Sequence, residues 1–367
     1  MKAVILAGGA GSRLQPLTDK RPKPLVPVGG KMCIEYVLTS LANADFRKII
    51  ITTGYLSEKL IPTLGDGERY DSSILYSFES SPAGTAGAVK KVGDFLDSTF
   101  VVASGDVLAD VDIGILYDFH RKSGGIATIA LTEVDDPREF GVVSLEQDGR
   151  ISRFKEKPSE DEVFSNLINA GIYVMEPGIL EYIPDDRPFD FSRDVFPLLM
   201  DKGEALYGLK IPGLWRDIGR PSDLLLASLD VIQRENKSKQ EGIPEGILGK
   251  GVDISGPVIF GEDVKVGVRT KIVGPAYIGD GARIGRDSII ERSCIYNSVK
   301  VDRETKIVDS ILLDGTVFGW KSCAEHSVLG YNCSIEDDVK LLRTILGDDT
   351  VVNKHSIISE ANISISS

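Results

Sequence analysis

Apolar residues recur at every sixth position between residues 254 and 290, and few folds accommodate so short a period. The repeated residues are Ile254, Phe260, Val266, Ile272, Ile278, Ile284 and Ile290. Glycine follows four of them, as Gly261, Gly267, Gly279 and Gly285. One inward apolar residue per short strand, with three strands per coil, is typical of a parallel β-helix. The period slips near Cys294 and returns only loosely through Ile311, Leu329 and Leu346, so we expect the later coils to be irregular.

Ahead of this repeat, β-type runs alternate with helical stretches from residue 1 to about residue 230. The runs that predict strands are Lys2–Leu6, Lys48–Thr53, Ile74–Phe78 and Phe100–Ser104. Helical spacing is present in Ile34, Val37, Leu38 and Leu41. The alternation predicts a doubly wound, Rossmann-like α/β domain with a largely parallel sheet. Ligands of such domains bind at the carboxyl ends of the strands, where Gly8, Gly54 and Asp106 fall.

A polar stretch separates the two patterns. Residues 233–246 read Gln-Arg-Glu-Asn-Lys-Ser-Lys-Gln-Glu-Gly-Ile-Pro-Glu-Gly, which indicates the end of a helix and a linker. The sequence therefore predicts an α/β domain over residues 1–232, a linker over 233–246 and a β-helix over 247–367.

Composition limits the class of protein. The chain has 367 residues, of which 42% are hydrophobic and 26% charged, and it contains no run near the roughly 20 apolar residues that span a bilayer. Its four cysteines lack Cys-x-x-Cys spacing and only three histidines accompany them, so we expect no zinc site, no disulfide framework and a reducing, cytoplasmic location. A net charge of −13 argues against nucleic acid as a partner.

A glycine-rich loop follows the first predicted strand. Gly8, Gly9 and Gly11 lack Cβ atoms, so backbone N–H groups there can approach and bond phosphate oxygens. Arg13 and Lys23 bring positive charge to the same place. This run predicts a binding site for a nucleoside triphosphate.

The run is also specific enough to suggest a family. Gly-Gly-x-Gly-x-Arg-Leu-x-Pro-Leu-Thr, at residues 8–18, followed by Pro-Lys-Pro-Leu at 22–25, resembles the signature of the sugar-phosphate nucleotidyltransferases, the nucleotide-sugar pyrophosphorylases. The α/β domain with a left-handed β-helix after it is most similar to the short mannose-1-phosphate guanylyltransferases. Gly-Thr-Ala-Gly at 84–87 and Asn-Ala-Gly-Ile-Tyr at 169–173 support that subfamily.

The resemblance implies roles for individual residues. Asp106 in Ser-Gly-Asp-Val and Asp217 in Trp-Arg-Asp-Ile-Gly would hold Mg²⁺, which prefers carboxylate oxygens and substrate phosphates. The catalytic set would be Arg13, Lys23, Asp106 and Asp217. The nucleotide-binding set would be Leu6, Ala7, Gly8, Gly9, Gly11, Ser12, Arg13, Gly84 and Thr85. The set that binds the sugar phosphate would be Gly141, Glu156, Lys157 and Asn169.

Two of these assignments carry a structural condition. Strand alternation puts Lys155 and Lys157 on one face and Glu156 on the other, so Glu156 and Lys157 can share a ligand only if the chain bends at Pro158. Thr85 opens a predicted helix, where its backbone amide could bond a base edge, or where the residue could be a plain N-terminal cap.

The resemblance implies that a sugar 1-phosphate attacks the α-phosphorus of the triphosphate in line and that pyrophosphate leaves. Arg13 and Mg²⁺ would bind the leaving side, Lys23 the α-phosphate region, and Lys157 the attacking phosphate. GTP and mannose 1-phosphate are the expected pair. The β-helix is expected to serve as an assembly surface of a homo-oligomer.

Three alternatives stay open. A glucose-1-phosphate thymidylyl- or uridylyltransferase would use the same mechanism. An acyltransferase β-helix is disfavoured, because His326 and His355 are expected to lie outside the regular coils. A catalytically silent regulatory subunit would be expected to have lost residues of the phosphate loop and the metal site.

Overall fold

The structure is a computed structural model that describes residues 1–238 and 246–364, and its chain forms two compact units. The first unit contains Met1–Ala10, Pro22–Leu25 and Cys33–Trp215. The second contains Gly11–Arg21, Val26–Met32 and the chain from Arg216 onward. Helix α6 (Pro221–Ser238) covers the first residues of the predicted linker, and 239–245 lie outside the described residues. The predicted domain limits at 232 and 247 stay predictions.

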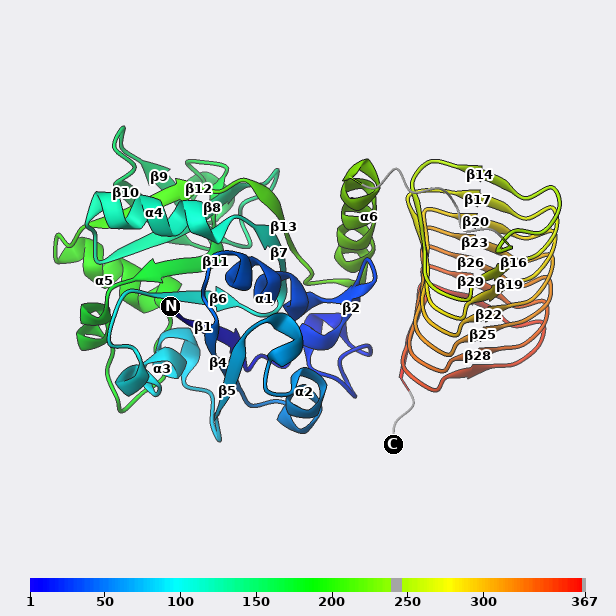
Figure 1. Ribbon diagram of the computed structural model, residues 1–367, viewed down its shortest axis with the longest axis horizontal. Helices are drawn as coiled ribbons and strands as arrows, with labels where there is room; N and C mark the ends of the chain where they lie inside the picture. The colour runs from blue at the N-terminus through cyan, green and yellow to red at the C-terminus, as the bar shows by residue number, and fades with distance from the viewer. Residues whose placement is uncertain (239–245, 365–367) are drawn as a thin grey trace. The chain divides into compact units, whose positions relative to one another are not determined.

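A nine-stranded mixed sheet forms the centre of the first unit (Figure 1). Its strands follow the order β10-β9-β11-β6-β1-β4-β5, and β8 pairs with both β11 and β12. The bounds are β1 Lys2–Ala7, β4 Lys48–Thr53, β5 Ser73–Phe78, β6 Phe100–Ser104, β8 Ala127–Glu133, β9 Gly141–Leu145, β10 Ile151–Glu156, β11 Leu167–Met175 and β12 Leu206–Lys210. The four predicted strands are confirmed, since each observed boundary lies within one residue of its prediction.

The sheet is parallel in only part of its width. Strands β6, β1, β4 and β5 are parallel, whereas β11 runs antiparallel to β6, β8 and β9, and β9 runs antiparallel to β10. Beyond β6 only β8 and β12 pair in parallel. The prediction of a largely parallel sheet was therefore wrong for the pairs made by β11 and β9. Strands β9 and β10 are joined by a short turn closed by a bond from Glu146 N–H to Arg150 O (2.8 Å), and so short a connection can join only antiparallel strands.

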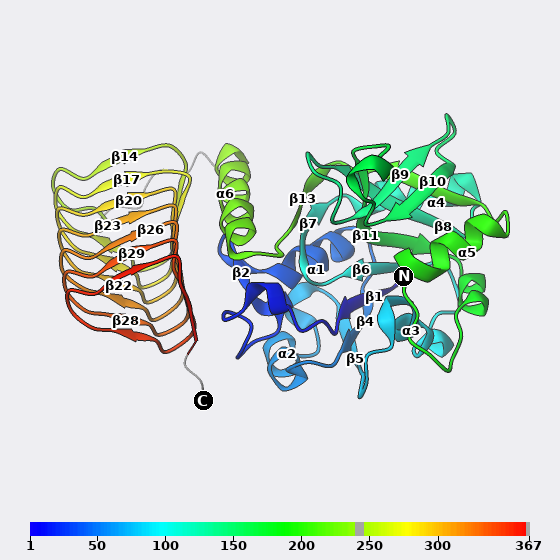
Figure 2. The ribbon, with the colours of Figure 1, turned by 180° about the vertical axis from the view of Figure 1, so that it is seen from behind.

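Helices cover the sheet of the first unit (Figures 1 and 2). They are α1 Cys33–Asn43, α2 Ser57–Leu64, α3 Gly84–Lys90, α4 Ile113–Ser123 and α5 Phe196–Asp201, with a π-helical turn η7 at Phe191–Val195 before α5. Short 3₁₀ turns occur at Ser12–Leu14, Lys23–Leu25, Glu68–Tyr70, Gly93–Phe95, Glu160–Glu162 and Pro177–Tyr182. The apolar face predicted for α1 is confirmed, because Ile34, Val37, Leu38 and Leu41 are fully buried. Strands β7 (Val107–Val111) and β13 (Gly213–Asp217) form a separate small sheet.

The second unit contains the predicted parallel β-helix, a left-handed one, together with α6 and a hairpin of β2 (Pro27–Val28) and β3 (Lys31–Met32). Three parallel sheets make its faces, and Figure 1 shows their strands stacked in chain order. The first holds β14 Asp253–Ser255, β17 Lys271–Val273, β20 Ile289–Glu291, β23 Lys306–Val308, β26 Cys323–Glu325, β29 Lys340–Leu342 and β32 Ile357–Ser359. The second holds β15 Val258–Phe260, β18 Ala276–Ile278, β21 Cys294–Ile295, β24 Ile311–Leu312, β27 Val328–Leu329, β30 Ile345–Leu346 and β33 Asn362–Ile363. The third holds β16 Lys265–Val266, β19 Arg283–Ile284, β22 Lys300–Val301, β25 Val317–Phe318, β28 Ser334–Ile335 and β31 Val351–Val352.

The later coils are regular, so the prediction of irregular coils was wrong. Ile272 pairs with Ile290, 18 positions on, and Ile290 pairs with Ile307, 17 positions on; the spacing of 17 then persists to the end of the helix. The lost residue lies in one corner, because Tyr277 pairs with Cys294 while Val273 pairs with Glu291. The six-residue repeat of the sequence is therefore interrupted at this corner, although the inward-facing apolar side chains of successive coils continue to stack.

Hydroxyl side chains stabilise the shortened corner. The amide of Ser310 donates to Ser293 Oγ (3.0 Å), Ser327 to Ser310 Oγ (3.0 Å) and Thr344 to Ser327 Oγ (3.1 Å). Each buried hydroxyl thereby satisfies an amide of the next coil that would otherwise lack a partner. His326 lies at this same corner, between Glu325 and Ser327, and His355 lies at another. The expectation that both histidines lie outside regular coils was therefore wrong.

None of the described helices is long and apolar enough to cross a membrane.

Candidate functional site

In the first unit, the glycine loop and Asp106 lie together at the ends of two neighbouring parallel strands. Leu6 of β1 is in register with Ser104 of β6, and the amide of Gly105 donates to Leu6 O (2.9 Å). A Cβ on Gly105 would lie 2.8 Å from Ile5 Cγ2, so only glycine permits this approach. Asp106 is consequently held beside the start of the loop, Gly8.

Lys23 is drawn to the same place. Its Nζ lies 3.1 Å from Asp106 Oδ2, and its side chain is only 6% exposed. Ser104 Oγ donates to the other carboxylate oxygen, Asp106 Oδ1, at 2.6 Å. The Asp106 side chain keeps 36% of its surface exposed. A buried cation therefore orients a carboxylate that still has an open side, and we name Lys23, Ser104 and Asp106 the Lys23–Asp106 cluster.

Asp106 is held in its ionised form. Burial would raise the pKa of this carboxyl, but the Lys23 ammonium and the Ser104 hydroxyl outweigh burial and place the pKa below its usual range. A carboxylate that is ionised at neutral pH, in a group of polar atoms, is a reasonable ligand for a hard divalent cation.

The loop residues themselves are open. Gly9 is exposed and Gly8 half-buried, while Leu6 and Ala7 belong to β1. Glu79, directly after β5, is a neighbour that the sequence reasoning did not single out. A Cβ on Gly8 would lie 3.3 Å from Glu79 Oε1, and the Glu79 amide donates to Thr53 O (2.8 Å) at the end of β4. Its position at a parallel strand's carboxyl end is the signal that could have identified it.

The second unit, described by itself, contains another charged pair. Arg13 Nη2 lies 3.5 Å from Asp217 Oδ2, and the two side chains are 53% and 20% exposed. A Cβ on the buried Gly219 would lie 2.8 Å from Asp217 Oδ2 and 3.0 Å from Arg13 Cζ, so this glycine makes room for both groups. Gly11 has a left-handed φ of 62° and starts the turn that contains the exposed Ser12 and Arg13.

Gly141 and Glu156 face each other across the β9–β10 pair in the first unit. A Cβ on Gly141 would lie 2.8 Å from Glu156 Oε2, so the missing side chain provides the space that the carboxylate occupies. Burial raises the pKa of Glu156, and Lys157 and Arg193 only partly oppose it. This half-buried carboxylate is therefore costly to keep ionised, which is common for functional carboxylates.

Lys157 lies at a bend of the chain. Its φ of 44° is left-handed, and its amide donates to Phe140 O (3.0 Å). The bend expected at Pro158 therefore occurs one residue earlier, at Lys157 itself. A lysine in this region of backbone space is strained, and such residues are concentrated at functional sites.

Asn169 organises the middle of β11. Its Nδ2 donates to Tyr173 Oη and Ser192 Oγ, both at 3.0 Å, and its Oδ1 accepts from the Gly171 amide at 2.9 Å. These bonds fix an interruption in strand pairing at Gly171, whose φ is 72°. A Cβ on Gly171 would lie 3.4 Å from Ser104 Cβ. The strand predicted to bind the sugar therefore lies next to the Lys23–Asp106 cluster.

The segment before α5 also contributes to this region, which the sequence reasoning missed. Ser192 and Arg193 belong to η7, and Asp190 precedes it. Arg193 and Asp190 both act electrostatically on Glu156. π-Helical turns often mark functional sites, but no local sequence pattern predicts one.

The start of α3 is tied to that segment. Gly84 has a φ of 75° and its Cβ would lie 2.5 Å from Phe189 O, so glycine is required there. The Thr85 amide and hydroxyl both donate to Asp190 Oδ1, at 3.0 and 3.1 Å. Thr85 is not the N-cap, which is Ala83. A base edge would have to replace the Asp190 carboxylate in order to bond the Thr85 amide.

Replacing Glu156 with glutamine should raise the melting temperature at neutral pH. The folded-state pKa of Glu156 lies above its unfolded value, so burying the ionised carboxylate destabilises the fold at neutral pH, and this penalty disappears as pH falls through the folded pKa. The gain should accordingly vanish in acid. Thermal unfolding followed by circular dichroism across pH measures it.

Glu162→Gln is the matched comparison. The Ser159 backbone amide and Lys155 lower the pKa of Glu162 to about 2, so this variant should lose stability at neutral pH. A lower melting temperature in Glu156→Gln would contradict the prediction.

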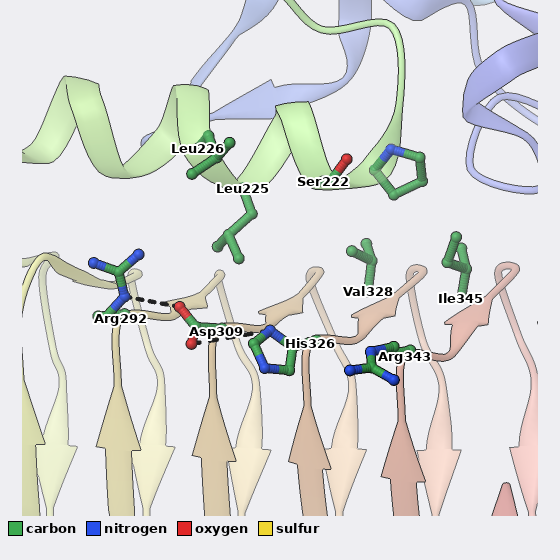
Figure 3. A pocket seen from close by; sticks show the side chains of 10 residues that line it. Ser222, Leu225, Leu226, Arg292, Asp309, His326, Val328, Arg343 and Ile345 are labelled. Atoms are coloured by element: carbon green, nitrogen blue, oxygen red, sulfur yellow. Dashed lines mark hydrogen bonds and ion pairs between the residues drawn. The ribbon is translucent and has the colours of Figure 1, made fainter. Parts of the chain in front are cut away.

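A cavity of about 600 Å³ lies elsewhere, in the second unit (Figure 3). Leu225 and Leu226 of α6 form one wall, and a row of β-helix corner residues forms the other (Figure 3). The corner residues are Arg292, Asp309, His326 and Arg343. Arg292 Nε donates to Asp309 Oδ1 at 2.8 Å, and His326 Nδ1 lies 4.0 Å from Asp309 Oδ2. None of the residues predicted to bind the nucleotide, the sugar phosphate or Mg²⁺ lines this cavity.

Across residues 1–238 and 246–364, no three His, Cys, Asp or Glu side chains are grouped so that they could hold a metal ion by themselves. The oxygen donors present, carboxylates and a hydroxyl, still suit Mg²⁺, which usually takes one or two carboxylates and completes its shell with water and substrate phosphates.

Two family models match the chain. The nucleotidyl transferase model matches residues 2–234, and a model described as the GMPPB C-terminal domain matches residues 272–366. These matches confirm the resemblance predicted from the glycine-rich signature and the hexad repeat.

Individual relatives carry different activities. The chain is 34% identical over 339 residues to a UTP–glucose-1-phosphate uridylyltransferase of Synechocystis, covering 85% of this chain and 87% of that one. It is 34% identical over 300 residues to a mannose-1-phosphate guanylyltransferase of Mycobacterium tuberculosis, covering 79% and 83%. It is 33% identical over 335 residues to mannose-1-phosphate guanylyltransferase 1 of Arabidopsis thaliana, covering 87% and 86%.

A solved structure also resembles part of this chain in fold. A Bacillus anthracis protein assigned as a glucose-1-phosphate thymidylyltransferase aligns with a TM-score of 0.58 and 29% identity, covering 66% of this chain and 98% of that one.

Proposed function

Because the chain belongs to the nucleotidyl transferase family and transfers a nucleotide to a sugar phosphate, we propose that its substrates are GTP and mannose 1-phosphate and its products GDP-mannose and pyrophosphate. The main structural support for nucleotidyl transfer is the Lys23–Asp106 cluster of the first unit. It lies where β1 and β6 end side by side, next to the start of the glycine loop. The mannose assignment is supported by the names of several relatives and by the C-terminal family match.

The roles of the residues follow from their charges. The backbone at Gly8, Gly9 and Gly11 would receive the triphosphate, and Arg13 would bind its leaving pyrophosphate. The buried Lys23 ammonium would lie at the α-phosphate region, and Lys157 would position the attacking phosphate. Catalysis would come from alignment and charge neutralisation, because a phosphate monoester is already a nucleophile.

Mg²⁺ is the cofactor that this donor set fits, with Asp106 in the first unit and Asp217 in the second as the proposed ligands. When bound, the ion would neutralise charge on the phosphates. Lys23 and Ser104 keep the Asp106 carboxylate ionised and oriented for that task.

For the sugar, the half-buried Glu156 carboxylate would accept hydrogen bonds from hydroxyl groups, with Gly141 leaving room for that carboxylate. The Asn169 side chain would act by holding β11 in shape, because its amide is already bonded to Tyr173, Ser192 and Gly171. Assembly into a homo-oligomer through the β-helix stays a prediction, which light scattering on the purified chain tests.

The test is pyrophosphate release with Mg²⁺ over GTP, dTTP, UTP and ATP, each paired with mannose 1-phosphate and with glucose 1-phosphate. Release should be highest with GTP and mannose 1-phosphate. Preference for UTP or dTTP with glucose 1-phosphate would reassign the substrates to those of the uridylyl- or thymidylyltransferases. No release with any pair would support the regulatory-subunit alternative.

A further inference from the structure

Within the second unit, the segment Gly11–Arg21 and the β-helix meet. This segment carries Arg13, the proposed triphosphate ligand, yet three of its residues contact β-helix corners. They are Pro16, Lys20 and Arg21. Pro16 packs against Gly347, where a Cβ would lie 3.2 Å from Pro16 Cβ, and Lys20 and Arg21 form ion pairs with Asp349 and Asp348. The β-helix therefore supports a part of the nucleotide site that is distant in the sequence.

The strongest contact is that of Arg21. Its Nη2 lies 2.7 Å from Asp348 Oδ2, and the two side chains are only 17% and 8% exposed. The guanidinium carbon lies 3.4 Å from the centre of the Tyr331 ring. Arg21 Nε is buried and has no hydrogen-bond partner among the described residues. Ion pairing with Asp348 and stacking on Tyr331 are thus the described contacts that fix this guanidinium.

The β-helix departs from its own pattern at this contact. One corner carries Asp or Asn in most coils, and each side chain accepts a bond from an amide of the preceding coil: Asp280 from Glu262, Asn297 from Asp280, Asp314 from Asn297 and Asp348 from Tyr331. Tyr331 occupies the equivalent position between Asp314 and Asp348, 17 residues from each. An aromatic ring replaces the capping side chain at the coil where Arg21 stacks.

Contacts within Gly11–Arg21 hold this segment in one conformation, so the position of Arg21 constrains the position of the residues near Gly11. Thr18 Oγ1 donates to Gly11 O at 3.0 Å, and Leu14 and Leu17 are buried. Arg13 lies inside this closed loop, where it pairs with Asp217. A shift of Arg21 should therefore displace the Arg13 guanidinium.

We propose that Arg21, Tyr331 and Asp348 are positioning residues for nucleotide binding, through which the β-helix holds Arg13 in place for the triphosphate. The inference rests on the proposed function, because it takes Arg13 as a triphosphate ligand. It gives the β-helix a role in the activity of each single chain, apart from any role in assembly.

Asp348→Asn is the decisive variant. Asparagine keeps an oxygen for the Tyr331 amide, as Asn297 does at its own corner, but removes the charge that pairs with Arg21. Asp349→Asn is the matched control, since Asp349 pairs with Lys20 at 2.7 Å with both side chains 52% exposed, and exposed pairs contribute little.

In Asp348→Asn, KM for the triphosphate should rise about tenfold, while KM for the sugar 1-phosphate changes little. Amide hydrogen exchange should become faster in residues 11–21. Asp348→Glu should restore part of the affinity. Asp349→Asn should match the wild type in all three measurements. Equal triphosphate KM and equal exchange in Asp348→Asn and Asp349→Asn would overturn the proposal.

Arg21→Met is a second variant, which keeps the test valid if Asp348→Asn disturbs folding of the β-helix. It removes the same ion pair without changing the β-helix, so the same rise in KM for the triphosphate is expected. Failure of the proposed function is recognised separately, as a wild-type chain without turnover. GTP binding by calorimetry, together with exchange in residues 11–21, then decides the inference. Weaker binding in Asp348→Asn supports it, and unchanged binding overturns it.

Discussion

Replacement of Asp106 by asparagine is expected to lower the rate of pyrophosphate release about a thousandfold, because in the proposed mechanism it removes a charge from the place where phosphate charge shifts. The variant keeps the size of the side chain and the Gly105–Leu6 bond that holds it in place. It loses the ionised oxygen that pairs with Lys23 and that we propose as a Mg²⁺ ligand. Asp217→Asn should show a comparable loss, because Asp217 is the second proposed ligand.

The fold should survive this change. The variant leaves the Lys23 ammonium, which is only 6% exposed, without the charge of Asp106, and breaking such a pair costs up to about 3–5 kcal/mol. This cost should lower the melting temperature but stays below most of the roughly 5–15 kcal/mol range that stabilises a folded domain. Asp97→Asn is the control, because Asp97 also pairs with a lysine, Lys2, at 2.7 Å but is 71% exposed. Pyrophosphate release and thermal unfolding should both be unchanged in the control. Retained turnover in Asp106→Asn would remove this residue from the metal site.

Replacement of Lys157 by methionine is expected to lower kcat/KM for the sugar 1-phosphate about a hundredfold while KM for the triphosphate changes little. The lysine is exposed at the bend after β10, next to the half-buried Glu156. Methionine retains most of the length of the side chain and removes the ammonium group, with its charge and its donors, that would hold the attacking phosphate. Steady-state kinetics with each substrate varied in turn measures the two effects separately.

Two variants make this test specific. Lys155→Met is the control, since Lys155 lies in β10, two residues before Lys157, and pairs with Glu162 at 3.0 Å, so its loss should leave the kinetics unchanged. Lys157→Gly should lose activity like Lys157→Met but melt at the same or a higher temperature, because glycine adopts a φ of 44° without strain. Equal kinetic losses in Lys155→Met and Lys157→Met would show a general charge effect instead of a phosphate contact.

Local patterns predicted much of the fold. Strands β1, β4, β5 and β6 have apolar runs of strand length that end in glycine or polar residues, so their bounds could be found within one residue. The first coils of the β-helix were predictable because seven aliphatic or aromatic residues keep one period. The six-residue repeat could no longer be followed beyond the corner between Glu291 and Cys294, where the coil is one residue shorter. The coils still stack there, because stacking of strands does not require every corner to have the same length.

The candidate site was predicted unevenly. Gly8, Lys23 and Asp106 were found because the glycine signature and a strand-end aspartate are local, and the structure places these three together in the first unit. Glu79, Asp190 and Arg193 were missed, because each reaches the site through packing of a segment without a repeat or motif. The engagement of the Thr85 amide by Asp190, 105 positions away, could not be anticipated for the same reason.

The sequence by itself determined the two architectures, the glycine-rich loop after β1 and the family, because these depend on side chains at short, regular spacings. The tertiary structure alone decided the antiparallel half of the sheet, the bend at Lys157 and the contact of Arg21 with Asp348, 327 positions away. Such contacts depend on which surfaces complement each other after the chain has folded, and complementarity between distant segments leaves no period in the sequence.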